Sequence, residues 1–166
     1  MNIKGMQEVI DVVSRIKQDF DRTGGLKSIF FVACGGSLAA SYPARYLLRN
    51  ESSSLRVFGI NSSEFVNAMP KSVGPNALVV CTSTKATAET VEALRQANKA
   101  GAITLGLTGY ADSLTAQNAR YSLVYYHGDE WYQDPSLIHC NSQGTSLKLA
   151  FQLLRETEGY SGYPKA

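Results

Sequence analysis

Hydroxyl side chains and glycines gather in two turns, each of which directly follows an apolar segment. The first turn, residues 34–37, reads Cys-Gly-Gly-Ser, and the second, residues 82–87, reads Thr-Ser-Thr-Lys-Ala-Thr. Hydroxyl groups and the free backbone N–H groups at the start of a helix bind anions, because the helix dipole places about half a positive charge there. The second turn holds four hydroxyls, which is more than one helix cap requires. The residues predicted to bind a phosphate are Gly36, Ser37, Thr82, Ser83, Thr84 and Thr87.

A simpler interpretation of both turns remains open. Ser37 and Thr87 could do no more than cap their helices, which is the commoner role of a single hydroxyl in such a place. Lys85 is the only cation of the second turn, and it could meet a phosphate as a point charge or be a solvated surface lysine. Glu89 follows in the next helical turn, and we expect it to face solvent, where it suits the helix dipole and repels no ligand.

The apolar pattern predicts the elements that position these turns. Runs of apolar and β-branched residues predict five strands, at residues 26–34, 55–60, 77–81, 102–107 and 121–126. Helical spacing predicts a first helix from Met6 to Phe20 and a last helix through Leu147 and Leu154, with His139 near its start. Between them, Pro43 should kink or delay the helix that follows the first turn. Shorter helices are expected at residues 62–69, 88–100 and 113–118.

Strands that alternate with helices favour one fold class. Right-handed crossovers place each helix over a parallel sheet, so we predict an α/β fold, a three-layer αβα sandwich with a five-stranded parallel sheet. Ligands of such sheets collect outside the carboxyl ends of the strands, where the strand order reverses. Both turns leave a strand at its carboxyl end, and we therefore expect them to lie together.

Length and composition exclude several classes of protein. The chain has 166 residues, of which 44% are hydrophobic and 18% charged, and this favours one folded domain over a disordered or coiled-coil chain. We expect the domain to span residues 1–158, with residues 159–166 as a tail. A net charge of +2 without a run of like charges argues against nucleic-acid binding. No segment has the ~20 continuous apolar residues that a membrane span requires.

The sequence also lacks the motifs of common cofactors and metals. The three cysteines, Cys34, Cys81 and Cys140, are widely spaced and odd in number, which fits neither a disulfide framework nor a zinc site. The dinucleotide fingerprint G-x-G-x-x-G and the Walker pattern are both absent. Glu8 and Asp11 lie where a secretion signal needs an uncharged apolar segment. We therefore predict a cytoplasmic protein that uses no metal and no cofactor.

The segments around both turns resemble the sugar isomerase (SIS) domain family. The resemblance rests on Phe-Phe-Val-Ala-Cys-Gly-Gly-Ser at residues 30–37 and on Thr-Ser-Thr-Lys-Ala-Thr-Ala-Glu at residues 82–89, which is similar to the family pattern S-x-S-G-x-T-x-E. It extends from about Met6 to Tyr163, is strongest toward the amino-terminal half of fructosamine-6-phosphate deglycases, and implies a flavodoxin-like strand order. Lys85 stands where the family has glycine, so the turn is expected to differ in shape, because a side chain disfavours positive φ.

The resemblance implies that Ser37 and the hydroxyls of Thr82, Thr84 and Thr87 hold a sugar phosphate, to which Ser83 adds its backbone N–H. Further possible substrate contacts are Lys85, Glu64 and Glu130.

Each of the two glutamates has an alternative role. Glu64 resembles part of a Ser-Glu-Phe segment in the isomerase halves of hexosamine synthases, although a glutamate also suits the start of a helix. Glu130 belongs to the loop Asp-Glu-Trp-Tyr, which could close over a sugar or serve an interface.

The resemblance also implies that relatives carry two SIS halves, the second of which supplies a glutamate base and a ring-opening histidine. Nothing here matches that half, and His127 and His139 are expected to be structural, so the catalytic residues stay unassigned. The leading hypothesis is the amino-terminal lobe of a fructosamine-6-phosphate deglycase that releases glucose 6-phosphate and an amine. The alternatives are an aldose–ketose phosphosugar isomerase and a non-catalytic sugar-phosphate-sensing module. A homodimer or a second SIS lobe is the expected protein partner, and residues 159–166 would begin the link to such a lobe.

Overall fold

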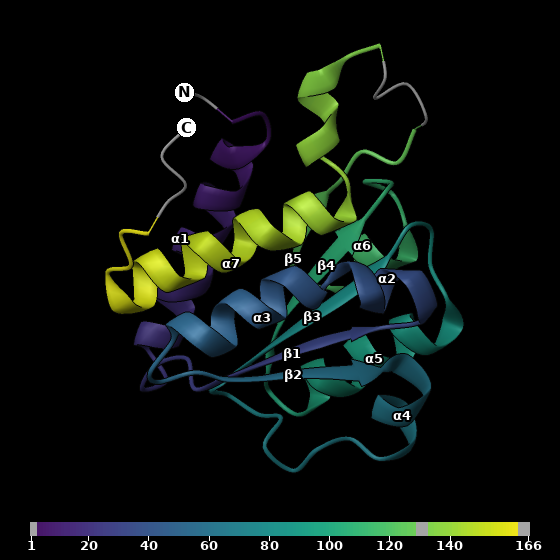
Figure 1. The fold of residues 1–166 in the computed structure, drawn as a ribbon. Helices are drawn as coiled ribbons and strands as arrows, with labels where there is room; N and C mark the ends of the chain where they lie inside the picture. Colours follow the sequence, from purple (N-terminus) through teal and green to yellow (C-terminus); the bar gives the residue numbers. More distant parts are fainter. Residues whose placement is uncertain (1–2, 129–132, 163–166) are drawn as a thin grey trace.

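The computed structural model describes residues 3–128 and 133–162 and contains one parallel sheet (Figure 1). Its strands are β1 (Ser28–Ala33), β2 (Arg56–Asn61), β3 (Ala77–Ser83), β4 (Ile103–Thr108) and β5 (Tyr121–Val124). The strand order is β2-β1-β3-β4-β5, and every neighbouring pair is parallel. The predicted fold class and its flavodoxin-like strand order are thus confirmed.

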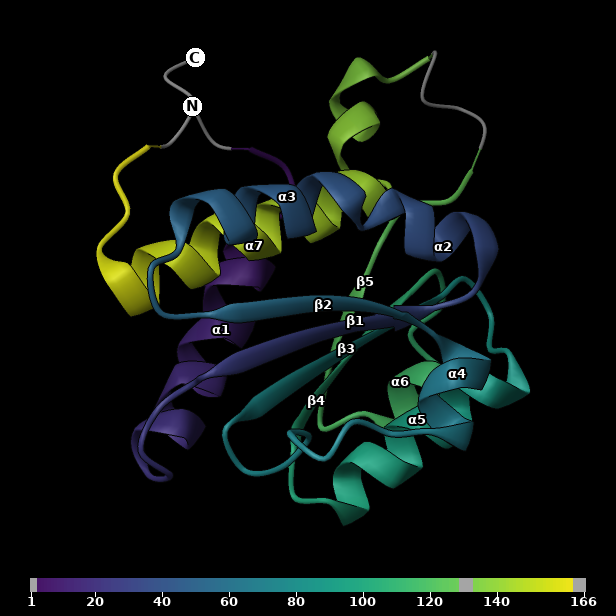
Figure 2. The ribbon, with the colours of Figure 1, turned by 60° about the horizontal axis from the view of Figure 1, so that its bottom comes forward.

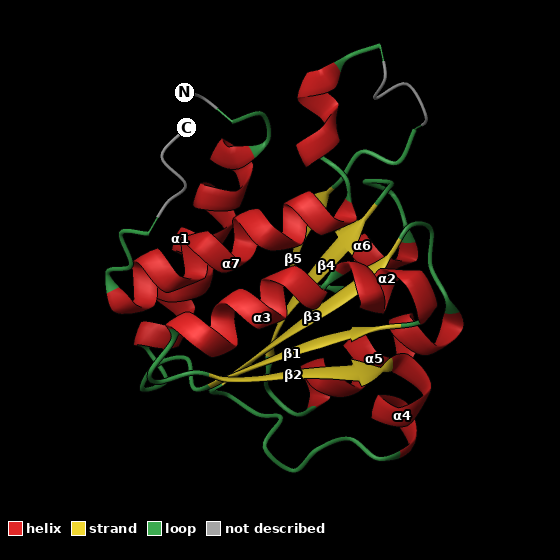
Figure 3. Cartoon of the chain, in the orientation of Figure 1, coloured by secondary structure: helices red, strands yellow, loops and turns green. Residues whose placement is uncertain are grey.

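Helices cover both faces of the sheet and complete three layers (Figures 2 and 3). One face carries α1 (Met6–Asp21), α2 (Gly35–Ala40), α3 (Tyr42–Glu51) and α7 (Ser142–Glu158). The other face carries α4 (Ser62–Asn67), α5 (Ala88–Lys99) and α6 (Leu114–Asn118), and a 3₁₀ helix, η2 (Pro135–His139), precedes α7. In the part of the chain that the structure describes, none of these helices has the length and apolar character to cross a bilayer.

The central strands are apolar on both sides because each side packs against a helical layer. Ile29 and Phe31 of β1 belong to the core under α1, α3 and α7, whereas Phe30 and Val32 belong to the core under α4 and α5. This alternation follows from the two-residue period of a strand. It fixes the direction of every side chain in β1 and β3, including those at their carboxyl ends.

Several strand boundaries differ from the predicted ones by one or two residues, and two larger differences, at the last strand and the last helix, have a local cause. The last strand ends at Val124, since Tyr126 N donates to Cys140 O (2.7 Å) and the chain leaves the sheet there. His139 was predicted to lie near the start of the last helix, but it ends η2 instead. Helix α7 starts only at Ser142, where the side chain of Asn141 caps it by accepting from Gly144 N. The helix after the first turn breaks at Ser41, and Pro43 lies in the first turn of α3, which confirms the expected interruption.

Candidate functional site

The two predicted turns meet at the point where the strand order reverses. Strands β1 and β3 are neighbours, with Ala33 paired to Thr82, and β2 lies beyond β1 on the side away from β3. The chain therefore leaves β1 toward one edge of the sheet and leaves β3 toward the other. Such a reversal opens a crevice at the carboxyl ends of the two strands. Residues 34–37 and 82–87 border this crevice from its two sides.

The first turn is open and depends on glycine. Gly35 has φ +51°, which lies in the left-handed region, and Cys34 takes the N-cap position of α2 without a capping hydrogen bond from its side chain. Apart from the neighbouring residues and the backbone of α2 itself, no atom of the described residues lies within 4 Å of the place that a Cβ would occupy at Gly35 or Gly36. Ser37 does not cap the helix, because it already belongs to the first turn of α2. Its hydroxyl has no partner among the described residues, so it is available to a ligand.

The base of the second turn carries two more unpaired hydroxyls. Thr82 and Ser83 end β3 and are 3% and 6% exposed. Neither hydroxyl forms a hydrogen bond within the described residues, and neither oxygen is among the fully enclosed unpaired side-chain atoms, so both keep contact with solvent. Because strand side chains alternate, Thr82 points to the layer that contains α2 and Ser83 to the layer that contains α5.

The middle of the second turn is held by the neighbouring strands. Thr84 Oγ1 and the hydroxyl of Tyr125 lie 2.8 Å apart, and Thr84 O accepts from Gly109 N (2.9 Å) and Thr108 Oγ1 (3.2 Å). Burial raises the pKa of Tyr125, which the hydrogen bond with Thr84 partly offsets, so this phenol stays protonated as a hydrogen-bonding group. The predicted phosphate ligand Thr84 is therefore fixed in position by the last residue of β4 and by residues that directly follow β4 and β5.

The end of the second turn starts α5 without a side-chain cap. Thr87 occupies the N-cap position, but its hydroxyl donates to Thr90 Oγ1 (2.6 Å) instead of accepting from the helix backbone. Thr90 in turn shares a hydrogen bond with Ser62 Oγ (2.9 Å), and both of these side chains are fully buried. The interpretation of Thr87 as a simple capping residue is thus wrong. No side chain in the described part of the chain accepts from the first N–H groups of α5, which leaves these groups free for an anion.

The charged candidates near the second turn are exposed. Lys85 has no partner within the described residues, and it does not adopt a positive φ, so it replaces the family glycine without backbone strain. Glu89 is exposed in the first turn of α5, as expected. Glu64 is exposed in the first turn of α4, which Asn61 caps by accepting from Ser63 N (3.0 Å). Glu130 lies outside the described residues.

Sequence reasoning missed an aromatic group beside the second turn. The rings of Tyr110 and His127 lie 4.5 Å apart between centroids, and they come from the segments that follow β4 and β5. Gly109 makes this approach possible, because a Cβ there would collide with the His127 ring and stand 3.0 Å from Thr84 O. A glycine directly after a strand was the available signal, since an isolated glycine at such a place often marks close backbone approach.

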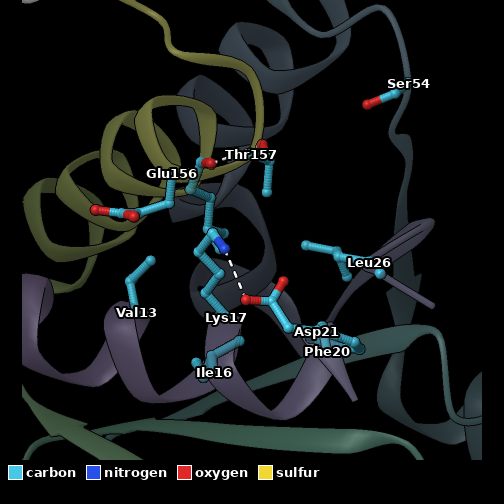
Figure 4. Close-up of a pocket in the computed structure, with 11 residues that line it drawn as sticks. Val13, Ile16, Lys17, Phe20, Asp21, Leu26, Ser54, Glu156 and Thr157 are labelled. Atoms are coloured by element: carbon cyan, nitrogen blue, oxygen red, sulfur yellow. Dashed lines mark hydrogen bonds and ion pairs between the residues drawn. The ribbon is translucent and has the colours of Figure 1, made fainter. Parts of the chain in front are cut away.

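Two hollows show how the ends of the sheet differ. One, of about 440 Å³, lies beside the second turn and is lined by Lys85, Ala86, Tyr110, Asp112 and Ser113. Another, of about 240 Å³, lies between α1 and α7 at the opposite, amino-terminal end of the strands (Figure 4). There Lys17 is already paired with Asp21 at 2.7 Å. Because the ammonium group of Lys17 already has a carboxylate partner in the chain, this second hollow is a poor phosphate site.

Most of the chain is similar to known proteins. A family model described as the SIS domain matches residues 26–153. Fructosamine deglycase FrlB of Bacillus subtilis (strain 168) is 34% identical over 139 residues, which are 83% of this chain and 41% of that protein. Fructoselysine 6-phosphate deglycase of Escherichia coli (strain K12) is 32% identical over 121 residues, which are 72% of this chain and 34% of that protein.

A solved structure gives the same result. The crystal structure of a protein assigned as a phosphosugar isomerase from Salmonella typhimurium LT2 is 35% identical, with a TM-score of 0.82 over 97% of this chain and 48% of that chain. The chain thus spans less than half the length of each of these relatives. With the sheet order and the two turns, these matches show that the chain belongs to the SIS domain family and is related to fructosamine deglycases and phosphosugar isomerases.

Proposed function

We propose that the chain binds the phosphate of a sugar phosphate between its two turns, as the amino-terminal lobe of a fructosamine-6-phosphate deglycase. The observation that carries the proposal is the set of unpaired donors at the strand reversal: the hydroxyls of Ser37, Thr82 and Ser83 and the uncapped start of α5. Donors of this kind suit a dianion. The names of the two deglycase relatives supply the substrate class.

In the proposed reaction the substrate carries an amine on C1 and a carbonyl on C2. A base removes a proton from C1, the electron pair forms a C1=C2 bond, and the C2 oxygen takes up a proton to give an enaminol. Protonation of C2 then yields an imine at C1, to which water adds as the amine leaves, and glucose 6-phosphate results. By holding the phosphate, this chain would fix C1 and C2 relative to the base.

The base itself is proposed to come from outside this chain. Glu64 and Glu89 are both exposed, and proton transfer requires a base within hydrogen-bond reach of C1. The curated relatives are more than twice as long as the segment that this chain matches. A second SIS lobe, or a second copy of the chain, is therefore the proposed partner that completes the site.

The test uses the purified chain with fructoselysine 6-phosphate. We expect calorimetry to detect binding, and we expect no release of lysine, because general acid–base help worth roughly 10²–10⁴ in rate is missing. Lysine release that disappears in Glu64→Gln would place the base in this chain and overturn the two-lobe proposal. Interconversion of glucose 6-phosphate and fructose 6-phosphate would favour the isomerase alternative, and the absence of any binding would overturn the phosphate site.

A further inference from the structure

Another hollow, between the first half of α1 and the start of α7, contains two nucleophilic side chains. It has a volume of about 530 Å³, and its lining includes Lys4, Glu8, Tyr126, Cys140 and Lys148. Cys140 directly follows η2, and Lys148 lies in the second turn of α7. No residue that lines this hollow belongs to residues 34–37 or 82–87. The thiol and the amine are therefore not used by the proposed phosphate site.

One backbone oxygen holds the thiol and the amine together. Lys4 O accepts from Lys148 Nζ at 2.8 Å and from Cys140 Sγ at 3.6 Å. The nitrogen and the sulfur themselves lie 4.0 Å apart. A glycine at position 5 leaves room for the amine, because a Cβ on Gly5 would stand 3.1 Å from Lys148 Nζ. The two nucleophiles are thus placed side by side before any reagent arrives.

The two groups differ in how a reagent from solvent can reach them. Lys148 is only 8% exposed, whereas Cys140 is half-buried and keeps contact with solvent in the hollow. A thiol is also a strong nucleophile at neutral pH, because a few per cent of it is already ionised. An electrophile that enters the hollow would therefore react with the sulfur before the nitrogen.

Lys148 is suited to take over a group from the sulfur. Within residues 3–128 and 133–162 it forms no ion pair with a carboxylate, although Glu8 lines the same hollow. Burial lowers the pKa of Lys148, and the nearby Glu8 and Cys140 offset this only in part. Because only the uncharged form of an amine is nucleophilic, a lowered pKa makes this lysine more reactive than an ordinary surface lysine.

We propose that Cys140 and Lys148 form an acyl-transfer site that takes an acyl group from a small acyl thioester, such as acetyl-coenzyme A, and fixes it on the lysine. The thiol of Cys140 attacks the carbonyl carbon of the thioester. A new S–C bond forms as the S–C bond of the donor breaks, and the departing thiolate takes up the proton of the thiol.

The second step moves the acyl group from sulfur to nitrogen. The uncharged amine of Lys148 attacks the same carbonyl carbon, the bond to Cys140 breaks, and the sulfur takes up the proton that the nitrogen loses. The products are an amide on Lys148 and a regenerated thiol on Cys140. The 4.0 Å separation suits this step, since an acyl carbon on the sulfur can approach the nitrogen to the ~3–3.5 Å of reacting atoms.

The experiment follows acetylation of the full chain by acetyl-coenzyme A, with mass spectrometry of each lysine. Lys99, which is exposed at the end of α5, is the internal reference. We expect Lys148 to react at least about tenfold faster than Lys99 although it is more buried, because an acyl group held on the neighbouring sulfur has a high effective concentration. Without the transfer from Cys140, burial would make Lys148 the slower of the two.

Two variants separate the two steps. Cys140→Ser should slow the acetylation of Lys148 by about tenfold or more and leave that of Lys99 unchanged. Lys148→Arg should let a thioester persist on Cys140, where hydroxylamine releases it. The matched control is Cys34→Ser, which removes the other half-buried thiol and should leave the acetylation of Lys148 unchanged.

Three results would overturn the inference. They are slower acetylation of Lys148 than of Lys99 in the unchanged chain, an unchanged rate at Lys148 in Cys140→Ser, and no thioester on Cys140 in Lys148→Arg. The first comparison is made within the unchanged chain, so it does not depend on the folding of a variant. None of these results bears on the phosphate site, which is tested separately.

Discussion

Two hydroxyl-rich regions lie at opposite ends of the sheet, and only one of them holds an anion from within the chain. Between α3 and β2, the residues Ser52, Ser53 and Ser54 surround the carboxylate of Glu158, the last residue of α7. Ser54 Oγ donates to this carboxylate at 2.8 Å and Ser53 N at 3.1 Å, and Ser52 Oγ donates as well. We call this group the filled cradle. At the strand reversal, by contrast, no carboxylate of the described residues bonds the free hydroxyls, so the proposed anion would come from outside the chain.

The filled cradle shows how strongly such a group favours an anion in this chain. Partial burial acts to raise the pKa of Glu158, but the hydrogen bonds from Ser52, Ser53 and Ser54 outweigh it and lower the pKa to about 2. Hydroxyl and backbone N–H donors alone, without a cation, thus stabilise the charged form. Residues 34–37 and 82–87, which we call the open turns, offer donors of the same two kinds and add the start of α5.

The largest effect is expected at Gly109, which packs against Thr84 of the second turn. Gly109→Ala would place a Cβ 2.9 Å from Thr84 Cγ2 and 3.0 Å from Thr84 O, and against the His127 ring. We expect the free energy of unfolding to fall by about 1–3 kcal/mol, as for overpacked cores, and the affinity for glucose 6-phosphate to fall with it. Urea denaturation and calorimetry measure the two effects.

The matched variant is Gly36→Ala, where a Cβ would meet no described atom outside α2 and its neighbours within 4 Å and where φ is not positive. Its free energy of unfolding should stay equal or rise by up to about 1 kcal/mol, because alanine is the better helix former. Equal losses of stability in the two variants would contradict the support assigned to Gly109.

The filled cradle should respond to loss of its charge. Glu158→Gln keeps the shape of the side chain but weakens its hydrogen bonds with Ser52, Ser53 and Ser54. We expect the free energy of unfolding to fall by about 1 kcal/mol, a value reduced for the solvent exposure of the cradle. Urea denaturation should show no change for Glu64→Gln, an exposed carboxylate in the first turn of α4. A loss of stability in both glutamine variants would argue against the cradle.

The same comparison predicts a pH dependence. The pKa of Glu158 in the folded chain, about 2, lies below its ordinary value of 4.5, so the folded state favours the charged form. Its stabilisation is fully present above the unfolded pKa and is lost as pH falls through the folded pKa. The difference in unfolding free energy between the unchanged chain and Glu158→Gln should therefore be constant above about pH 5 and shrink toward pH 2. A difference that stays constant down to pH 2 would be inconsistent with this pKa.

The smallest effect concerns the hydrogen bond that positions Thr84. Tyr125→Phe leaves the ring in place but removes the partner of Thr84 Oγ1, which should weaken glucose 6-phosphate binding by about threefold to tenfold, the worth of one ordinary hydrogen bond. Tyr121→Phe, which removes a bond to Asp19 on α1, is the matched control and should leave the affinity unchanged. An unchanged affinity in Tyr125→Phe would mean that Thr84 needs no positioning.

The fold and the location of both turns could be predicted from the sequence. Apolar runs such as residues 29–33 report burial on both sides directly, and the carboxyl ends of neighbouring parallel strands necessarily share one edge. Whether each hydroxyl caps a helix, bonds to another side chain or stays unpaired could not be predicted in the same way. Ser37 and Thr87 were open to interpretation as caps, and only the backbone path shows that Ser37 lies inside α2 and that Thr87 bonds to Thr90.

Contacts between residues far apart in the chain were the other part that sequence could not supply. Tyr125 reaches Thr84 across 41 positions, and Glu158 reaches Ser54 across 104. Such pairs depend on how elements far apart in the chain pack together, which no local sequence pattern reports. His139 was misplaced for a different, local reason, because Asp134 and Pro135 start a short 3₁₀ helix before α7.

The central claim is that the open turns bind a phosphate from outside the chain, and one measurement tests it most directly. Calorimetry would compare glucose 6-phosphate with glucose for the unchanged chain, for Thr82→Val, which removes an unpaired hydroxyl at nearly constant shape, and for Ser53→Ala in the filled cradle. We predict binding of glucose 6-phosphate only, a loss of about tenfold to a hundredfold in Thr82→Val, and no loss in Ser53→Ala. Equal binding of glucose and glucose 6-phosphate, or equal affinities in the two variants, would contradict the account.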